Sequence, residues 1–238
     1  MKDGFIRVAA ATPDIHVADP QYNSEQIIEL MEQGSARGVK VMAFPELCLT
    51  AYTCSDLFLQ ESLLREAKKE LKRILQASKS KDMILFVGMP WMHKGKLYNV
   101  AAVLNRGRIL GIVPKKHLPN YSEFYELRHF NPGMEKVEMT DWEGVQVPMG
   151  MNLLFACRTM PELVLAAELC EDVWVPCPPS ISHALAGATV IANCSASDET
   201  TGKDQYRYNL ICGQSARLVC GYIYANAGCL LYTSPSPR

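Results

Sequence analysis

The sequence predicts an α/β domain built on mixed sheets, and two observations carry this prediction. Short apolar runs of strand character alternate along the chain with amphipathic segments of helical period, which is typical of strands joined through helices. Two of the runs are separated only by Asn105-Arg106-Gly107, a turn sequence that favours an antiparallel hairpin. With 238 residues, 48% of them hydrophobic, the chain can bury one large core.

The amino-terminal part predicts a strand, a helix and a second strand. Phe5–Ala11 is an apolar run that a Thr-Pro pair interrupts, so we expect a strand there. A helix follows, capped by Asn23 or Ser24 and ending near Gly38. Its apolar face consists of residues at helical spacing, namely Ile27, Ile28, Leu30 and Met31. Val39–Phe44 is a short apolar run between Gly and Pro and predicts the second strand.

A second helix and a third strand are predicted next. Leucines at helical spacing indicate an amphipathic helix over Leu63–Ala77. The lysine-rich stretch Lys68–Lys81 overlaps this helix, and we interpret the stretch as a solvated helix face rather than a basic binding patch. Met83–Val87 predicts a strand, which we expect Gly88 and Pro90 to close.

The rest of the chain continues the alternation. Tyr98–Leu104 and Arg108–Val113 are the two strands of the predicted hairpin. A strand over Leu163–Ala167 leads into an acidic segment, and Ser182 is expected to cap a short helix. The last predicted elements are a strand, a helix and a strand, over Val190–Ala192, Tyr206–Val219 and Tyr222–Ala225.

The composition argues against several classes of protein. The net charge is −1 with 21% charged residues, so no long-range field favours binding to nucleic acid or to an anionic membrane. The longest apolar runs, such as Val100–Leu104, are far too short to cross a bilayer. The amino terminus lacks the basic and apolar regions of a signal peptide, so we expect a cytoplasmic location.

The cysteines predict neither a metal site nor a disulfide framework. There are nine of them, no Cys-x-x-Cys pair occurs, and the five histidines are scattered, so we expect no bound metal. Without a secretory signal the thiols are expected to be reduced and mostly buried as small hydrophobic groups. This interpretation covers Cys48, Cys157, Cys194, Cys212 and Cys220.

Cys170 is the exception, because it lies in the acidic segment Glu168-Leu-Cys-Glu-Asp172. Neighbouring negative charge raises the pKa of a thiol, so a reactive cysteine here needs a base and a cation from elsewhere in the chain. Glu46 follows one predicted strand in Phe-Pro-Glu-Leu, and Lys115 follows another in Pro-Lys-Lys-His. A carboxylate, an ammonium and a thiol at three strand ends form a candidate catalytic triad.

The local chemistry leaves two alternatives open. Lys116 is adjacent to Lys115 and is equally suited to act as the cation. A papain-like pair of Cys170 with His117 or His183 also fits the residue types present. The nucleophile elbow, the dinucleotide-binding glycine motif and the phosphate-binding loop are all absent from the sequence.

Three motifs in this chain resemble those of the carbon–nitrogen hydrolases of the nitrilase superfamily. They are Phe44-Pro-Glu-Leu47, Pro114-Lys-Lys-His-Leu118 and Glu168-Leu-Cys-Glu-Asp172. Four further segments are similar to one branch of the superfamily, the amino-terminal glutaminase domains of glutamine-dependent NAD⁺ synthetases. These segments are Leu47–Phe58, Leu118–Glu126, Asn193–Ser197 and Gly213–Arg217.

The resemblance implies a fold and a set of catalytic roles. The fold is a nitrilase-type α-β-β-α sandwich with mixed sheets. Glu46 is implied as the general base, Lys115 as the group that stabilises the oxyanion, and Cys170 as the nucleophile. Glu126 matches a fourth, supporting glutamate placed to orient Lys115 or the substrate.

The resemblance also implies a substrate site and partners. Tyr121, Ser197, Lys203 and Glu171 match positions that bind glutamine, with the lysine suited to the α-carboxylate. The glutaminase reaction needs no cofactor, whereas ATP and Mg²⁺ belong to a synthetase domain that amidates nicotinic acid adenine dinucleotide. The full enzyme is expected to be a homo-oligomer.

We expect the sequence to be only part of such an enzyme. Residues 1–229 match the hydrolase domain but stop before the last strands that the family has, and no synthetase motif occurs. Residues 230–238 match nothing in the family and predict a disordered or artefactual tail. Two alternatives to a glutaminase stay open: a free-standing amidase or carbamoylase of the same superfamily, and an inactive truncated fragment.

Overall fold

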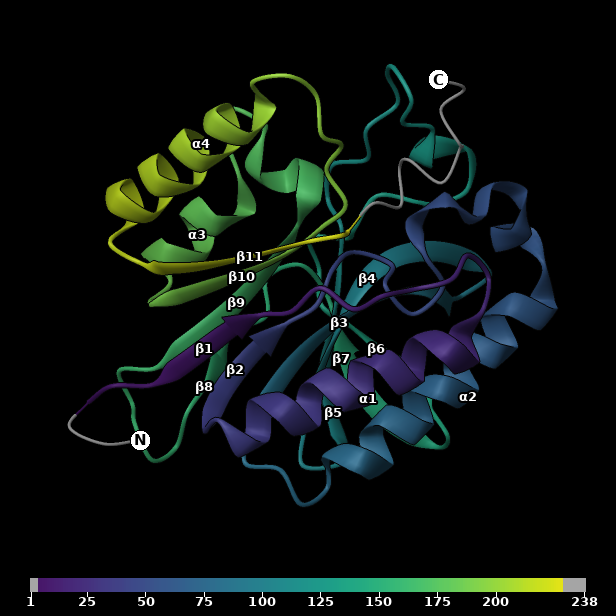
Figure 1. The fold of residues 1–238 in the computed structure, drawn as a ribbon, viewed down its shortest axis with the longest axis horizontal. Helices are drawn as coiled ribbons and strands as arrows, with labels where there is room; N and C mark the ends of the chain where they lie inside the picture. The colour runs from purple at the N-terminus through teal and green to yellow at the C-terminus, as the bar shows by residue number, and fades with distance from the viewer. Residues whose placement is uncertain (1–3, 229–238) are drawn as a thin grey trace.

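Two β-sheets lie face to face between two layers of helices in the computed structural model, which describes residues 4–228 (Figure 1). The larger sheet has the strand order β1-β2-β3-β4-β5-β7-β6. Its strands are β1 (Arg7–Ala10), β2 (Val39–Ala43), β3 (Ile84–His93), β4 (Lys96–Asn105), β5 (Arg108–Pro114), β6 (Glu138–Trp142) and β7 (Val145–Met149). The smaller sheet has the order β11-β10-β9-β8. Its strands are β8 (Phe155–Ala156), β9 (Val164–Leu169), β10 (Val190–Ser195) and β11 (Gly221–Asn226).

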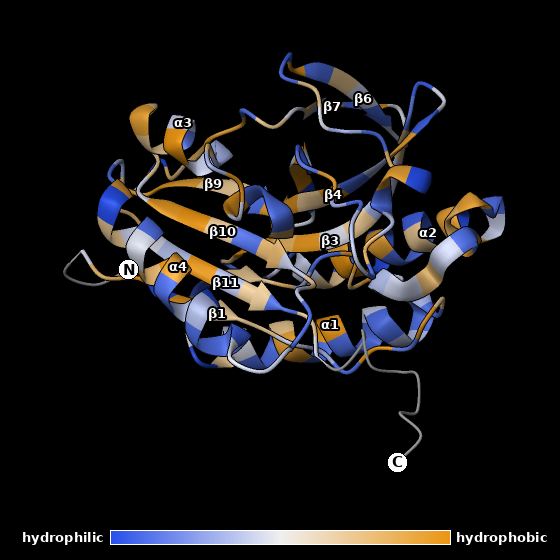
Figure 2. Ribbon diagram, turned by 90° about the horizontal axis from the view of Figure 1, so that it is seen from above, coloured by the Kyte–Doolittle hydropathy of each residue, from blue (hydrophilic) through white to orange (hydrophobic). Residues whose placement is uncertain are grey.

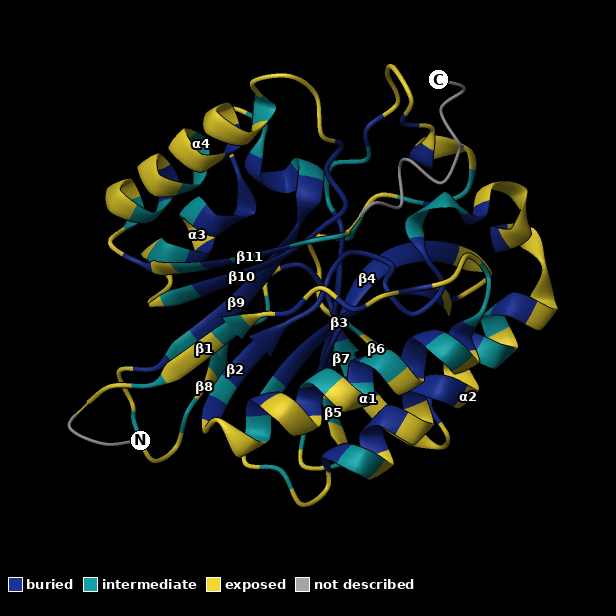
Figure 3. Cartoon of the chain, viewed as in Figure 1, coloured by how far each residue is buried: buried dark blue, intermediate teal, exposed yellow. Residues whose placement is uncertain are grey.

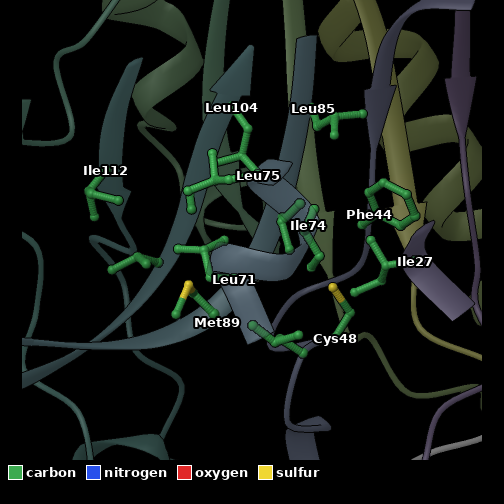
Figure 4. Close-up of a cluster of buried hydrophobic side chains, with 14 of the residues drawn as sticks. Ile27, Phe44, Cys48, Leu71, Ile74, Leu75, Leu85, Met89, Leu104 and Ile112 are labelled. Atoms are coloured by element: carbon green, nitrogen blue, oxygen red, sulfur yellow. The ribbon is translucent and has the colours of Figure 1, made fainter. Parts of the chain in front are cut away.

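The helices cover the outer faces of the two sheets. They are α1 (Pro20–Ala36), α2 (Glu61–Ser78), α3 (Pro179–Leu185) and α4 (Lys203–Leu218). Helices α1 and α2 lie on the larger sheet, where a buried apolar cluster includes Ile27, Phe44, Leu71 and Leu85 (Figure 4). Helices α3 and α4 lie on the smaller sheet (Figure 1). The predicted α-β-β-α sandwich is therefore confirmed.

A separate buried cluster fills the space between the sheets. Val41, Phe86 and Val103 of the larger sheet pack with Leu165 and Ile223 of the smaller one. The central strands are buried along most of their length, whereas the outer faces of the helices are exposed (Figure 3). Figure 2 shows the matching hydropathy, with apolar strands at the centre and polar helix faces outside.

Both sheets are mixed, as the sequence predicts. In the larger sheet β1, β2 and β3 are parallel, while β3, β4 and β5 are antiparallel neighbours. In the smaller sheet β9, β10 and β11 are parallel and β8 is antiparallel to β9. The predicted hairpin is β4–β5, and its two turn residues, Arg106 and Gly107, have φ of 47° and 78°. Positive φ at both positions matches the twist of the strands that the turn joins.

The predicted helix caps are wrong. Asp19 caps α1 by accepting a hydrogen bond from the Tyr22 amide at 3.1 Å. Asn23 lies inside the helix and donates to the backbone carbonyls of His16 and Leu49, and Ser24 donates to Glu70. These side chains are buried and join α1 to neighbouring segments. Ser182 likewise lies inside α3, which starts at Pro179.

Strand β3 does not close at Gly88 and Pro90 as predicted but continues to His93. Strand β2 pairs with β3 only as far as Phe86, so at Pro90 the β2 side of β3 has no neighbouring strand. The missing N–H of the proline therefore breaks no hydrogen bond between strands on that side. The hairpin β6–β7 and the short strand β8 were not predicted. Charged residues (Glu138, Asp141 and Glu143) interrupt β6 and its turn, so no apolar run marks the hairpin, whereas β8 lies within the short apolar run Leu153–Cys157, a signal that sequence reasoning missed.

The cysteine prediction is correct for three residues and wrong for two. Cys48, Cys194 and Cys220 are buried, whereas Cys157 is half-buried and Cys212 is exposed. The eight cysteines between residues 4 and 228 are all free thiols. The predicted tail at 230–238 lies outside the described residues. Across residues 4–228, every helix is too short or too polar to cross a membrane.

Candidate active site

The three predicted catalytic residues each follow the carboxyl end of a strand. Glu46 follows β2 through Phe44 and Pro45, Lys115 comes directly after β5, and Cys170 comes directly after β9. The Glu46 amide donates to the carbonyl of Ser195, the last residue of β10, at 3.3 Å. This bond brings the ends of strands from the two sheets together, so the site lies where the sandwich closes at one end.

Glu46, Lys115 and Glu126 form a buried ion triad. The Lys115 Nζ lies 2.6 Å from Glu46 Oε1 and 2.5 Å from Glu126 Oε1. The Asn99 side-chain amide donates to both carboxylates, at 2.7 Å and 3.2 Å. The Tyr52 hydroxyl donates to Glu126 Oε1 at 2.7 Å. The lysine is fully buried, so these bonds compensate for the loss of its hydration.

Burial and mutual charge shift the pKa values in this triad. Burial raises the pKa of Glu46 to about 7 with the help of Glu126, although the Lys115 charge acts in the opposite direction. Burial alone would lower the pKa of Lys115, but Glu126 and Glu46 hold it well above its ordinary value. The lysine is therefore a permanent cation, and Glu46 is a carboxylate with the basicity of a good proton acceptor near neutral pH.

One oxygen of Glu46 has no partner among the described residues. Glu46 Oε1 accepts from Lys115 and Asn99, whereas the buried Oε2 accepts no hydrogen bond. Buried carboxylate oxygens are normally hydrogen-bonded. A free oxygen on a carboxylate of raised pKa is the group expected of a base that awaits a proton.

Cys170 occupies a strained backbone position at the end of β9. Its φ is 41°, and its amide donates to Asn193 Oδ1 at 3.1 Å. The Asn193 amide group donates in turn to the Tyr222 hydroxyl at 3.1 Å, and that hydroxyl donates to Glu168. A non-glycine residue with positive φ costs about 1–3 kcal/mol and persists only where its surroundings hold it. Here the buried network from β9, β10 and β11 provides that support.

The Cys170 thiol lies within the field of the ion triad. Burial raises its pKa, the Glu46 charge raises the pKa further, and the Lys115 charge lowers it. The thiol therefore stays protonated at rest, and Glu46 is the base close enough to influence its proton. The predicted carboxylate, ammonium and thiol are thus brought together in one buried cluster.

Two glycines let the catalytic loops pack closely. A Cβ on Gly88 would lie 2.2 Å from the Pro45 carbonyl oxygen and 2.4 Å from the Leu47 amide nitrogen. A Cβ on Gly133 would lie 2.9 Å from the Pro114 carbonyl oxygen, and the Gly133 amide donates to the Lys115 carbonyl at 2.7 Å. Only glycine fits these approaches without movement of the loops.

The residues predicted to bind glutamine lie in two groups. The Tyr121 hydroxyl donates to both oxygens of Glu171, at 3.1 Å and 2.9 Å, immediately beside Cys170 in the chain. Lys203 starts α4, is paired with Asp198 and lies 5.3 Å from the centre of the Trp174 ring. Ser197 is buried between β10 and α4, where its amide donates to Asn226 Oδ1 at 2.8 Å.

The geometry decides between the alternatives that the sequence leaves open. The side chain of Lys116 is 34% exposed and lies 3.8 Å from Glu135, whereas Lys115 is buried in the triad. His183 Nε2 bonds to the Met151 carbonyl at 2.9 Å. The charges that act most strongly on Cys170 are those of Glu46 and Lys115 and not of a histidine. Lys115 is therefore the cation at the site, and the structure gives no support to a Cys–His pair.

Sequence reasoning missed several residues of the site. Asn99 is the polar residue in the middle of the otherwise apolar strand β4, and this interruption was the available signal. Arg207 lies one helical turn beyond Lys203, with a side chain only 10% exposed. Its Nη1 donates to Glu199, but Nε and Nη2 have no partner in the described part of the chain. No group of three potential metal ligands occurs within residues 4–228.

Comparison with known proteins places the chain among enzymes that act on carbon–nitrogen bonds. Residues 7–232 match the family model described as carbon-nitrogen hydrolase. The chain is 41% identical over 225 residues to the glutamine-dependent NAD(+) synthetase of Mycobacterium tuberculosis, covering 94% of this chain and 33% of that protein. It is 31% identical over 222 residues to the synthetase of Aquifex aeolicus, covering 93% of this chain and 35% of that protein.

Solved structures show the same relationship. The glutamine-dependent NAD(+) synthetase of Cytophaga hutchinsonii superimposes with a TM-score of 0.84 at 29% identity, covering 93% of this chain and 36% of that one. An amidase from Nesterenkonia superimposes with a TM-score of 0.72 at 19% identity, a likeness of fold alone. The chain spans about a third of the length of the synthetases that it matches.

Proposed function

Because the chain belongs to the carbon–nitrogen hydrolase family, we propose that it hydrolyses the side-chain amide of glutamine and releases ammonia. The observation that carries the proposal is the unpartnered Oε2 of Glu46, buried beside a permanent cation and a protonated thiol. Such a buried cluster can activate a nucleophile and stabilise an oxyanion.

The reaction follows from the three groups. Glu46 Oε2 takes the Cys170 proton, and the thiolate attacks the amide carbon of glutamine. The negative charge that develops on the carbonyl oxygen is stabilised by the Lys115 ammonium. The protonated Glu46 gives its proton to the nitrogen, the carbon–nitrogen bond breaks, and ammonia leaves a thioester on Cys170. Glu46 then deprotonates a water molecule, which attacks the thioester and releases glutamate and the thiol.

The charges around the cluster fit the two charged groups on the α-carbon of glutamine. The Tyr121–Glu171 pair offers a carboxylate to the α-ammonium group. Ser197 and Lys203 lie in the segment from β10 to α4 and offer a hydroxyl and a cation to the α-carboxylate. The free Nε and Nη2 of Arg207 form an edge of the shape that binds a carboxylate with two parallel hydrogen bonds, so we include Arg207 in this subsite.

The released ammonia would serve an ATP-dependent amidation of nicotinic acid adenine dinucleotide to NAD⁺. The support is the similarity to glutamine-dependent NAD(+) synthetases, which are about three times as long as this chain. That step would need ATP and Mg²⁺ on a further domain. Assembly into a homo-oligomer and a cytoplasmic location belong to the same proposal.

The test is ammonia release from L-glutamine, compared with propionamide as a simple amide. We expect turnover of glutamine with little turnover of propionamide. A diazoketone analogue of glutamine should label Cys170 among the nine cysteines, and Cys170→Ala should abolish both turnover and labelling. Turnover of propionamide at the same kcat/KM as glutamine would favour a general amidase. Labelling chiefly at Cys48 or Cys177 would contradict the assignment of the nucleophile.

A further inference from the structure

The Asp172 carboxylate joins the loop of the nucleophile to the loop of the catalytic lysine. Asp172 is buried, with 1% of its surface exposed. Its Oδ2 accepts from the Leu169 amide at 3.0 Å and from the Lys116 amide at 3.4 Å. Its Oδ1 accepts from the His117 amide at 2.8 Å. One side chain thus binds backbone on both sides of the site.

The two loops come from different sheets. Leu169 ends β9 of the smaller sheet and precedes Cys170, whereas Lys116 and His117 follow β5 of the larger sheet and Lys115. We propose that Asp172 is a positioning residue that fixes the Lys115 ammonium relative to the Cys170 sulfur, an inference that rests on the proposed function. Within residues 4–228 the hydrogen bonds of the aspartate go to backbone amides and not to the thiol or the ammonium, so it acts through the backbone of both loops.

A purely local role would not explain the contacts. The bond to Leu169 alone would cap the 3₁₀ turn Cys170–Val173. The shortest bond, however, reaches His117 in the other loop, 55 residues away in the chain. The Lys115 loop is held on its other side by Lys115 N–H to the Asn99 carbonyl at 2.9 Å and by Gly133 N–H to the Lys115 carbonyl at 2.7 Å. Asp172 is what ties this loop to the nucleophile.

The chemistry of the contacts requires a carboxylate. Three N–H donors converge on two oxygens, and an ionised carboxylate is the side chain that only accepts. Burial raises the pKa of Asp172 to about 7 together with the charge of Glu168, while the bonds from Leu169 and His117 lower it. An asparagine of the same size would turn its NH₂ group toward one of these donors and lose that bond.

The experiment compares Asp172→Asn with the wild-type protein. The lysine loop is held less tightly in the variant, and misplacement of a catalytic group by about 1 Å can cost about 10²-fold in rate. We expect kcat to fall by about 10–100-fold. KM for glutamine should change by less than about twofold, because the three hydrogen bonds of Asp172 involve neither Tyr121 nor Lys203. Glu70→Gln is the matched control: it alters another buried carboxylate, bonded to Ser24 between α1 and α2, and should keep full activity.

A double-mutant comparison separates positioning from a general structural role. If Asp172 acts by placing Lys115, then Asp172→Asn should have little further effect on kcat in a Lys115→Met background. Equal losses in both backgrounds would overturn the proposal, as would an unchanged kcat in the single variant. Should Asp172→Asn fail to give a cooperative melt, Asp172→Ser makes the same comparison, because its hydroxyl can still cap Leu169 but cannot reach His117.

A readout without glutamine keeps this inference separate from the proposed function. The rate of Cys170 alkylation by iodoacetamide reports the thiolate that Lys115 stabilises. Loss of the negative charge of Asp172 beside the thiol would by itself speed alkylation, so slowing can only come from displacement of Lys115. We expect Asp172→Asn to slow it at least about fivefold at pH 8, with Glu70→Gln unchanged. If the wild-type protein does not hydrolyse glutamine but shows this difference, the proposed substrate is wrong and the positioning role stands. An unchanged alkylation rate overturns the positioning role whatever the substrate.

Discussion

Gly88→Ala is expected to damage the active site from inside the β-sheet. Gly88 lies in β3 opposite Ala101, and the backbone from Pro45 to Leu47 crosses directly over it. A methyl group at this position would lie 2.2 Å from the Pro45 carbonyl oxygen, whereas ordinary contact begins at 3.4 Å. The difference, 3.4 minus 2.2, requires the segment that carries Glu46 to move by about 1.2 Å.

This displacement sets the size of both effects. An added methyl group in a well-packed interior costs about 1–3 kcal/mol of stability when the neighbours are backbone and cannot rotate away. A shift of about 1 Å in a catalytic group can cost about 10²-fold in rate. We therefore expect Gly88→Ala to fold with a lower melting temperature and to lose about 10²-fold in kcat for glutamine.

The assay is ammonia release from glutamine, measured alongside thermal unfolding. Gly213→Ala is the matched control, because Gly213 lies in α4 and the new Cβ would have no atom within 4 Å apart from its chain neighbours and the backbone of its own helix. A Gly-to-Ala change inside a helix stabilises by about 0.5–1 kcal/mol, so this variant should keep its activity and melt slightly higher. A Gly88→Ala protein with wild-type kcat would refute the close packing of the Glu46 segment on β3.

Three further predictions test the site directly. Because the pKa of Glu46 is raised to about 7 and only its ionised form accepts the thiol proton, kcat/KM should fall as pH falls through about 7 and be about tenfold lower at pH 6. A profile that is flat from pH 8 to pH 5.5 would contradict the role of Glu46 as the base. Lys115→Ala should lose at least about 10²–10³-fold in turnover, whereas Lys116→Ala should lose less than about twofold; equal losses in two folded variants would argue against the assignment. Arg207→Met and Lys203→Met should each raise KM for glutamine by about 10–100-fold. KM for 4-aminobutanamide, which lacks the α-carboxylate, should not change. Equal effects on both amides would exclude a role of these two residues in binding the carboxylate.

The three groups of the candidate site could be predicted from the sequence because each follows a recognisable strand. Glu46, Lys115 and Cys170 each follow an apolar strand, namely β2 and β5 of the larger sheet and β9 of the smaller one. The structure places the carboxyl ends of these three strands at the same end of the sandwich. The family resemblance added Glu126, which the structure places 2.5 Å from Lys115. What local pattern could not supply was the pairing of these groups, which depends on contacts between residues far apart in the chain.

The errors share a physical cause, since in each case tertiary packing decided the role of a residue. Asn23 and Ser24 have the chemistry of helix caps but form buried bonds to other segments, and Asp19 takes the cap position. Gly88 was interpreted as the end of a strand, whereas it is the point where a second backbone approaches. Asp172 was recognised only as a charge beside the thiol, because its partners Lys116 and His117 are distant in sequence.

In the proposed mechanism, the ion triad lets a buried proton transfer proceed with little electrostatic cost. Two carboxylates surround one ammonium, so the cluster has one negative charge in excess before reaction. When Glu46 takes the Cys170 proton, its charge disappears and a thiolate charge appears, and the excess is again one. The Lys115 ammonium stays paired with Glu126 while it turns from Glu46 toward the developing oxyanion. Replacing Glu126 by a neutral group would keep the net charge constant during the transfer, but it would remove the negative charge that helps raise the pKa of Glu46. The pKa of Glu46 would fall, and the base would be weaker at the moment when the thiol must lose its proton.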